Sequence, residues 1–362
     1  MYSISSQWDT LKTVCVGSVY PPEVFSFIKD KTLRNHFETL VTETAEDLDN
    51  LAVYLNKQFG IKVLRPQLEQ DLDAYRIDNG FMAPPIAARD FMCMIDDVMY
   101  YPGIGNKNYL LNSYDKSVST WEEHQWKDQK VYNRKVRFFD SIFAHILDQG
   151  NNVVASPLDY FNSSFIARLP NTLIVGTQDT NDDRVAIKKT WQQMFPDKTI
   201  FVKDTEGHAD ATFCPVNENL IITAYEDIDY SDMLPNAEIL HVPAEVTFLG
   251  DEFANAIHLA ENKWFLEGME HNQQLVDTVD HYFSNWVGQV DETAFMINIL
   301  MIDSKNAVVN SDNKEVRQAM QKHGVELHVV PFKHRFFWDT GTHCLTQDLH
   351  RDNNSKKFNK NY

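Results

Sequence analysis

The feature that most constrains the fold of this chain is a local pattern that occurs five times. A segment with helical spacing of apolar residues ends at a glycine or a proline, and a short apolar segment follows. In the first example, residues 33–59 predict a helix, Gly60 a stop and residues 61–64 a strand. The other predicted helix–strand pairs are residues 143–149 with 153–154, 185–195 with 199–202, 232–234 with 238–242, and 314–323 with 325–330.

Four further apolar runs, at residues 91–95, 172–175, 220–223 and 297–302, are expected to be buried strands. Alternating helices and strands predict an α/β fold, and a doubly wound open sheet explains the alternation as well as a repeat or barrel architecture does. The absence of a Gly-x-Gly-x-x-Gly turn and of a P-loop argues against the classical nucleotide-binding sheet. Polar segments follow the expected strands, and repeat and barrel folds build sites where strand ends meet.

Composition narrows the function. With 43% hydrophobic and 12% aromatic residues in 362, the chain can bury a large core. The net charge of −19 and the lack of a dense Lys/Arg run argue against nucleic-acid binding. The acidity suits a cationic substrate, and it suits plain solubility equally well. Scattered cysteines, no signal peptide and no membrane-length apolar run predict a reducing, cytoplasmic location.

The segment 341–348 contains the cysteine most typical of a reactive site. Cys344 has polar neighbours, and Gly341 is expected to permit an unusual backbone conformation beside it. By contrast, Cys15 and Cys93 lie in apolar runs and are expected in the core. From spacing alone, a simple buried thiol remains the favoured interpretation of Cys344. A metal site is disfavoured because no paired ligand spacing supports it; its candidate ligands are His334, His343, Cys344 and His350.

Two further motifs carry charged groups. On an extended segment, His208 and Asp210 would share a face and could serve as an acid/base and a cation holder. A hydrogen-bonded polar pair at a strand end is an equal alternative. Arg89 and Asp90 precede an apolar run, and an ion pair that caps a strand is the default interpretation.

One chemistry unites these motifs. A guanidinium is planar and cationic, and two carboxylates can hold it with charge-assisted hydrogen bonds. A thiolate can then attack its central carbon, and a histidine can protonate the departing amine. The three motifs supply one cysteine, one histidine and two carboxylates.

These residues resemble those of the amidinotransferases in the guanidino-modifying (pentein) superfamily. Residues 208–213 are similar to the family's His-x-Asp-Ala-Thr-Phe motif, and residues 342–351 to its nucleophile segment. Arg89-Asp90 resembles the Arg-Asp motif, residues 8–17 the first strand and residues 298–303 a late strand. The similarity runs in order from Trp8 to Arg351.

The resemblance implies a single-domain, five-bladed pseudo-fivefold α/β-propeller over residues 1–351, followed by a polar tail at residues 352–362. It implies that Cys344 is the nucleophile, His208 the acid/base, and Asp90 and Asp210 the guanidinium holders. It implies no metal or organic cofactor. The expected partners are a small guanidine donor, an amine acceptor and a second copy of the chain in a homodimer, with no nucleic acid and no membrane.

The chain departs from the family at the substrate-binding positions. Ser164 stands where the family has an acidic residue that orients the histidine, and Asp159 could replace it if the loop shifts. Near the position where a family member has an arginine that binds the substrate carboxylate, this chain has Glu226 or Asp227. Near the positions of two substrate-binding serines, it has Asp291 and Glu292. Acidic groups there predict a substrate that carries an amine at that end, unless these residues simply face solvent. A guanidino-group hydrolase or deiminase and a catalytically silent binding homologue remain alternatives to the transferase.

Overall fold

The computed structural model of the chain describes residues 1–77, 80–101, 137–156, 161, 163–177, 184–205, 208–226, 228–242, 269, 272–283, 286 and 295–353. Within these residues, the strands form five three-stranded sheets and one two-stranded sheet. Each three-stranded sheet contains one antiparallel and one parallel strand pair. The described strands therefore do not form one open sheet, and the doubly wound alternative is wrong for this part of the chain.

The strands of the five three-stranded sheets are, in the order in which they pair, β17 (Thr346–Asp352), β1 (Thr10–Val16) and β2 (Lys62–Leu64); β5 (Cys93–Ile95), β6 (Val98–Tyr101) and β7 (Asn152–Ala155); β10 (Thr199–Asp204), β9 (Thr172–Thr177) and β8 (Ile166–Leu169); β11 (Phe213–Asn217), β12 (Leu220–Thr223) and β13 (Glu238–His241); and β14 (Leu300–Met301), β15 (Asn306–Val309) and β16 (Glu326–Val329). The two-stranded sheet pairs β3 (Arg76–Ile77) with β4 (Gly80–Phe81).

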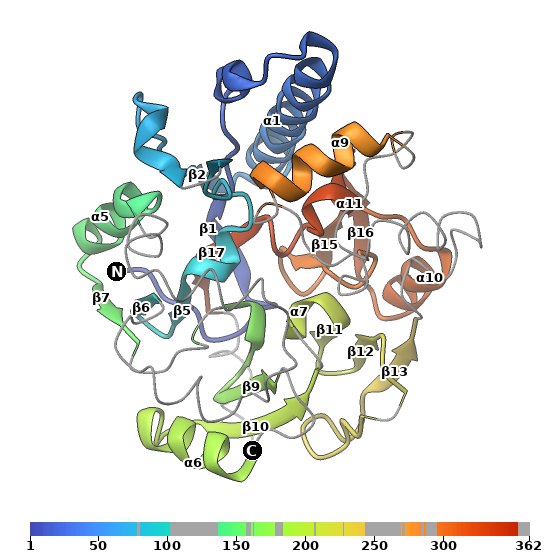
Figure 1. Cartoon of the computed structure of the whole chain (residues 1–362). Helices are drawn as coiled ribbons and strands as arrows, with labels where there is room; N and C mark the ends of the chain where they lie inside the picture. Colours follow the sequence, from blue (N-terminus) through green and yellow to red (C-terminus); the bar gives the residue numbers. More distant parts are fainter. Residues whose placement is uncertain are drawn as a thin grey trace.

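Four of these sheets gain their parallel strand after a helix. The helices are α1 (Lys31–Phe59), α5 (Asp140–Asp148), α6 (Arg184–Met194) and α10 (Lys314–Lys322). Figure 1 shows these helices toward the periphery, with β1 and β17 nearer the middle. Shorter helical segments are η1 (Pro22–Phe27), η2 (Leu72–Tyr75), η3 (Ala88–Phe91), η4 (Ser163–Phe165), α7 (Ala209–Thr212), α9 (Gln273–Thr278), η6 (Val279–Phe283) and α11 (Arg335–Trp338).

Four of the five predicted helix–strand pairs are confirmed. Gly60, Gly150 and Gly324 each follow a helix with a positive φ, the left-handed conformation that glycine adopts without steric cost. In the fourth predicted pair, only the strand is confirmed, as β13. Residues 232–234 form a turn rather than a helix, because three residues before a proline are too few to build helical hydrogen bonds.

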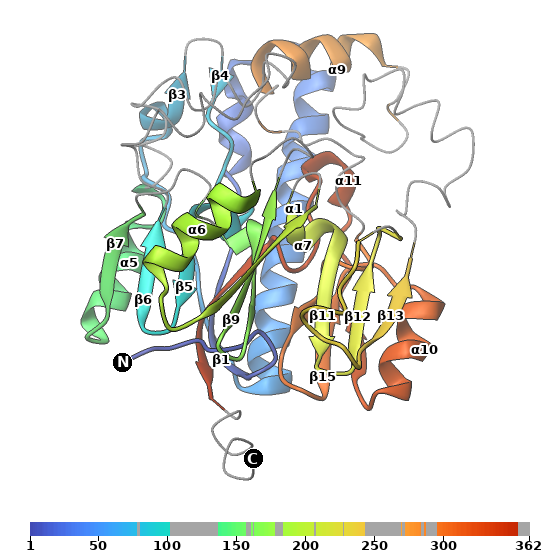
Figure 2. The same ribbon diagram turned by 90° about the horizontal axis from the view of Figure 1, so that it is seen from below.

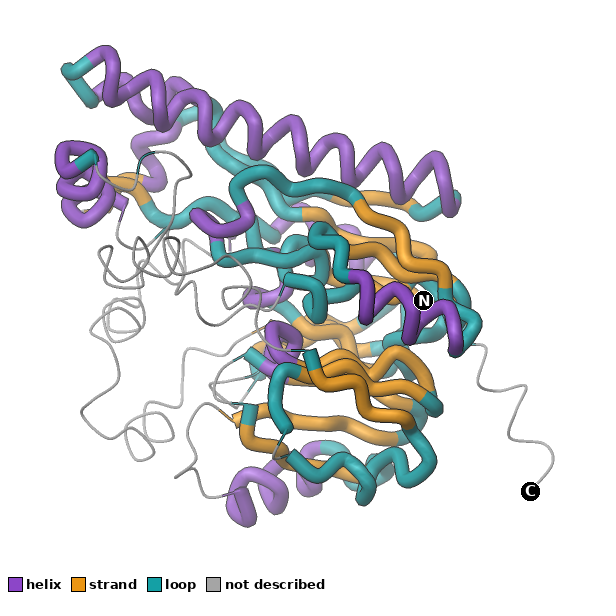
Figure 3. The backbone as a smooth tube through the Cα atoms, turned by 90° about the vertical axis from the view of Figure 1, so that its right-hand side faces the viewer, coloured by secondary structure: helices purple, strands orange, loops and turns teal. Residues whose placement is uncertain are grey.

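The long helix α1 shows how the apolar pattern becomes a core. The Asp30 side chain accepts a hydrogen bond from the Leu33 amide at 3.0 Å and caps its first turn. Figure 3 shows α1 running along one side of the molecule, and Figure 2 shows it behind the strands. Its buried face includes every apolar residue that defined the predicted helix, namely Phe37, Leu40, Val41, Leu48, Leu51 and Leu55. None of the helices that the structure describes is long and apolar enough to cross a membrane.

Candidate active site

Cys344 lies in a tight turn between α11 and β17. The Leu345 amide donates to the Gly341 carbonyl at 3.0 Å, and the Thr346 amide donates to the His343 carbonyl at 3.1 Å. The Cys344 side chain is 4% exposed, and all four cysteines of the chain are buried free thiols. Burial therefore does not separate Cys344 from the others, but its polar surroundings do.

Gly341 shapes this turn by its lack of a side chain. It does not adopt a positive φ, so the predicted unusual backbone conformation is wrong. A Cβ atom at this position would lie 2.4 Å from both Cβ and Oδ1 of Asn298, closer than two such atoms can approach. Glycine is required here because the Asn298 side chain packs directly against the backbone of the nucleophile segment.

Asp210 lies beside Cys344. Its Oδ2 is 3.4 Å from the Cys344 Sγ and 2.8 Å from the His343 Nδ1. An ionised carboxylate only accepts hydrogen bonds, so the thiol and the Nδ1–H of His343 both donate to this oxygen. The Oδ1 atom is buried and has no hydrogen-bond partner among the described residues. The site thus presents one occupied and one open carboxylate oxygen.

The geometry of the His208 motif differs from the prediction. Residues 209–212 form the short helix α7 rather than an extended segment, and His208 occupies its N-cap position. The two side chains therefore do not share a strand face. The His208 ring instead packs edge-on against Phe165, with ring centroids 4.9 Å apart.

Asp90 comes from η3 and meets η4. The Ser164 hydroxyl donates a hydrogen bond to Asp90 Oδ1. Burial raises the pKa of the Asp90 carboxyl above its ordinary value, and the negative charge of Asp210 raises it further, whereas protonated His208 and the Ser164 hydrogen bond act in the opposite direction. The structure thus brings together Cys344, His208, Asp90, Asp210 and Ser164, the five predicted site residues that it describes.

Arg89 does not cap a strand as the default interpretation had it. Its Nε donates to the His343 carbonyl at 2.8 Å, and its Nη2 lies 3.2 Å from Asp348 Oδ1. Asp348 also binds Arg168, at 2.6 Å and 2.7 Å to its two oxygens, and Arg351 at 2.8 Å. All four side chains are buried. This cluster fixes the backbone of the nucleophile segment, because Arg89 binds that segment directly and Asp348 belongs to the strand that follows it.

The charges around Cys344 favour its neutral form. Burial raises the pKa of the thiol well above its ordinary value, and the negative charges of Asp210 and Asp90 raise it further. Burial lowers the pKa of His343 to about 4, and the charge of Arg89 acts in the same direction. Burial opposes ionisation of Asp210, but the hydrogen bond from His343 and the charge of Arg89 lower the pKa of its carboxyl. The resting site therefore holds a neutral thiol, a neutral imidazole at His343 and an ionised Asp210.

Sequence reasoning missed several residues of this site. Asn298 was noted only as part of a strand, although its side chain contacts Cys344. Arg168 carried no signal at all, because an arginine inside an apolar strand is indistinguishable from a solvent-facing one until its neighbours are known. The position of Asp348, four residues after Cys344, was the one available signal for the buried arginine cluster.

Other predicted residues fall elsewhere. Asp159, Asp227, Asp291 and Glu292 lie outside the described residues. Glu226 lies 3.2 Å from the His241 Nδ1, and its side chain is 80% exposed, so it faces solvent in this structure.

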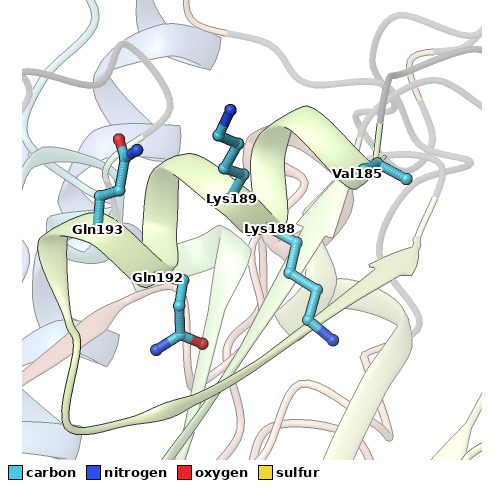
Figure 4. A pocket seen from close by; sticks show the side chains of 5 residues that line it. All are labelled: Val185, Lys188, Lys189, Gln192 and Gln193. Atoms are coloured by element: carbon cyan, nitrogen blue, oxygen red, sulfur yellow. The ribbon is translucent and has the colours of Figure 1, made fainter.

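The ligands considered for a metal site are dispersed. His334 pairs with Glu43 at 2.7 Å, and His350 binds the backbone of Ser3 at 3.1 Å. Neither joins Cys344. Figure 4 shows a shallow pocket on α6, and none of its lining residues belongs to the group around Cys344.

Comparison with solved structures identifies the fold. The chain aligns with the inosamine-phosphate amidinotransferase of Streptomyces griseus at a TM-score of 0.62 and 17% identity, covering 98% of this chain and 97% of that one. It aligns with SxtG, an amidinotransferase of the saxitoxin pathway of Microseira wollei, at a TM-score of 0.60 and 16% identity, covering 97% and 98%. It aligns with the agmatine deiminase of C. jejuni at a TM-score of 0.56 and 10% identity, covering 97% and 96%. No protein-family profile and no curated protein sequence matches the chain.

The chain thus has the fold of the guanidino-modifying enzymes, the pentein fold, as the sequence resemblance predicted. The neighbours named above include two amidinotransferases and a deiminase, so proteins that share this fold catalyse different reactions.

Proposed function

We propose that this chain is an enzyme that acts on guanidino groups, and that it is an amidinotransferase with Cys344 as its nucleophile. The observation that carries the proposal is the open, buried Oδ1 of Asp210 beside the Cys344 thiol. A buried carboxylate oxygen without a donor is costly unless a ligand supplies one. The N–H groups of a guanidinium match that need, and Asp90 offers a second carboxylate nearby.

The proposed reaction begins when the guanidinium of the donor binds Asp210 and Asp90. Its positive charge favours loss of the Cys344 proton, because a cation near sulfur lowers the pKa of a thiol. The thiolate attacks the central carbon, so that a C–S bond forms. His208 takes the proton of the thiol, the C–N bond to the departing amine then breaks, and His208 passes this proton to the amine. The product is an amidino group on Cys344.

In the second half, the acceptor amine attacks the amidino carbon, a new C–N bond forms and the C–S bond breaks. His208 takes the proton that the acceptor amine loses. If water attacks the amidino group instead, the C–S bond breaks, urea forms and the enzyme is a hydrolase. In a deiminase, ammonia leaves in the first step, the substituted guanidino carbon stays on sulfur, and water then releases a ureido product. The similarity of residues 8–17 and 342–351 to amidinotransferase motifs supports the transferase.

We further propose that residues 1–351 form a five-bladed propeller with the three-stranded sheets as blades, because all five share one pairing pattern. Residues 352–362 would then be a polar tail. We also propose that the enzyme works in the cytoplasm as a homodimer without a metal or organic cofactor.

The experiment that tests the function is mass spectrometry of the protein after incubation with arginine or agmatine. An amidino adduct on the Cys344 peptide, absent in Cys344→Ser, is expected for the transferase. Ornithine release in the presence of an amine acceptor supports transfer, and citrulline release supports a deiminase. An adduct on Cys15, Cys93 or Cys214, or full turnover by Cys344→Ser, overturns the mechanism. Absence of any adduct or product with all donors supports a silent binding homologue.

A further inference from the structure

One buried amide joins the nucleophile to its neighbouring carboxylate residue. Asn298 is 0% exposed and lies just before β14. Its Oδ1 accepts from the Cys344 amide at 3.0 Å. Its Nδ2 donates to the Asp210 carbonyl at 2.9 Å and to the Cys344 Sγ at 3.0 Å. All polar atoms of this side chain therefore contact either the nucleophile or Asp210.

Two of these contacts fix the orientation of the amide. A backbone N–H can only donate, so the atom that faces the Cys344 amide must be the Asn298 oxygen. A backbone carbonyl can only accept, so the atom that faces the Asp210 carbonyl must be the Asn298 nitrogen. The second hydrogen of that nitrogen then points at the sulfur, whichever protonation state the sulfur has.

The sulfur has two polar neighbours of opposite character. Asp210 Oδ2, at 3.4 Å, accepts the S–H of the neutral thiol and repels an ionised sulfur. The hydrogen bond from the Nδ2–H of Asn298 to the sulfur strengthens when the sulfur becomes negative, because hydrogen bonds to ionised acceptors are roughly twice as strong as neutral ones. The other charged or titratable groups that surround the site are Asp90, Arg89, His343 and His208.

We propose that Asn298 is a further catalytic residue, whose Nδ2–H stabilises the ionised sulfur of Cys344 while its Oδ1 holds the backbone amide of that residue. In the reaction proposed above, on which this role rests, the ionised sulfur occurs twice: before attack on the donor and when the C–S bond breaks. In both steps the carboxylates hold the substrate cation, and Asn298 provides the N–H that faces the sulfur directly.

The turn at Gly341 maintains this contact. The Asn298 side chain occupies the space that a Cβ atom at position 341 would need, so the lack of a side chain at Gly341 allows Asn298 to lie against Cys344. A substitution there can therefore displace Asn298 without removing any polar group, which separates the position of the amide from its chemistry.

The test measures the pH dependence of Cys344 alkylation by iodoacetamide, followed by peptide mass spectrometry. Alkylation needs only the thiolate and no guanidine substrate. Asn298→Asp keeps an oxygen for the Cys344 amide but replaces the N–H that faces sulfur. Asn298→Leu removes the N–H without adding charge. Each is expected to lower the alkylation rate at a fixed pH about tenfold to a hundredfold, the factor that a charge-assisted hydrogen bond is worth.

Asn310→Asp is the matched control. Asn310 is also buried, and its Nδ2 donates to the Thr340 carbonyl at 3.2 Å, in the same stretch of chain but on a backbone atom rather than the sulfur. The Asn310→Asp variant adds the same negative charge as Asn298→Asp, and its alkylation profile should stay near that of the wild type. Gly341→Ala, which displaces Asn298, should slow alkylation in the same direction and replaces the Asn298 variants if these do not fold.

Equal alkylation profiles in wild type, Asn298→Asp, Asn298→Leu and Gly341→Ala overturn the role of Asn298, even if the wild type turns over guanidines. Slow alkylation confined to the Asn298 and Gly341 variants supports it. If that slow alkylation occurs in a protein that never modifies a guanidine, the proposed function fails while the stabilisation of the sulfur by Asn298 stands.

Discussion

The Oδ2 atom of Asp210 lies 3.4 Å from the Sγ of Cys344, so the carboxylate accepts a hydrogen bond from the neutral thiol in the resting protein. The same closeness disfavours the thiolate, because two negative charges would then face each other in a buried site. In such a site we expect the thiol to stay mostly protonated until positive charge is placed beside it. This relationship leads to the first prediction.

Binding of a guanidinium compound should ionise Cys344. Burial and the two carboxylates raise the pKa of the thiol, so in the free protein the thiol stays protonated at neutral pH. A bound cation adds positive charge beside the sulfur and lowers that pKa. The ultraviolet absorbance of the thiolate should therefore rise when methylguanidine is added at neutral pH. Cys344→Ser is the control, and an equal rise in that variant would assign the signal to another group.

Asp90→Asn and Asp210→Asn should each lower kcat/KM by on the order of tenfold or more, the expected cost of losing a charge-assisted hydrogen bond to the substrate. Steady-state kinetics with arginine and agmatine measures the effect. Glu226→Gln is the matched control, because Glu226 is an exposed carboxylate that pairs with His241. Unchanged kinetics in both Asp variants would show that these residues do not hold the guanidinium.

His208→Ala should slow departure of the amine while leaving donor binding intact, because the acid that protonates the leaving group is lost. Rapid-quench analysis of a single turnover separates binding from adduct formation. Weaker donor binding with an unchanged rate of amine release would contradict the acid/base role. An amine with a low pKa as leaving group needs less protonation and should partly restore the rate.

Asp348→Asn should destabilise the fold by about 3–5 kcal/mol, because it leaves buried arginines without their counter-charge. Asp312→Asn is the control. It removes an exposed pair with Arg317 and should cost less than about 1 kcal/mol. Urea unfolding compares the two variants. Equal losses of unfolding free energy would show that the buried cluster stabilises the fold no more than the exposed pair does.

The same cluster predicts how stability depends on acid. Buried arginines hold the pKa of Asp348 well below its ordinary value although burial opposes this. The contribution of Asp348 to the free energy of unfolding is therefore fully present above the unfolded pKa of about 3.9, and it is lost as the pH falls toward the pKa of the folded state. Asp348→Asn should lack this part of the acid dependence between those two pKa values.

At least one substrate, the donor or the acceptor, should carry an amine at the end that faces Asp291 and Glu292, and glycine should be a poor acceptor. The proposal depends on Asp291 and Glu292, whose side chains would repel a carboxylate and attract an ammonium. A panel of donors and acceptors with and without the α-carboxylate tests it, on wild type and on Asp291→Ser/Glu292→Ser. Strong preference for arginine with glycine, unaltered by the double substitution, would discard it.

Periodicity was a sound guide wherever one helix face packs on one sheet. The apolar residues of α1 and the glycine after it predicted both the helix and the strand that follows. The prediction for residues 297–302 was less accurate, since only Leu300 and Met301 form a strand. Asn298 lies outside that strand, and its side chain bonds to Cys344 and Asp210.

Motif spacing predicted which residues form the site but not the hydrogen bonds and ion pairs among them. Cys344, His208, Asp90 and Asp210 come together, yet the sequence predicted an extended strand at His208 and missed that Asp210 binds His343. The arginines around Asp348 come from η3, β8 and β17, three elements far apart in sequence. Contacts that depend on how distant segments meet leave no trace in local periodicity.

The pairing of β1 with β17 joins Thr10 to Asp352, and it closes a loop that contains every other described strand. We expect contacts between residues so distant in sequence to form late, because closing a long loop costs conformational entropy before the new contacts stabilise the chain. Cys344 lies two residues before β17 begins. A folding intermediate that has already built its other sheets would thus still have its thiol away from Asp210 and Asn298. The proposed active site would then form only when β17 pairs with β1. Partly folded molecules would therefore not react with guanidines.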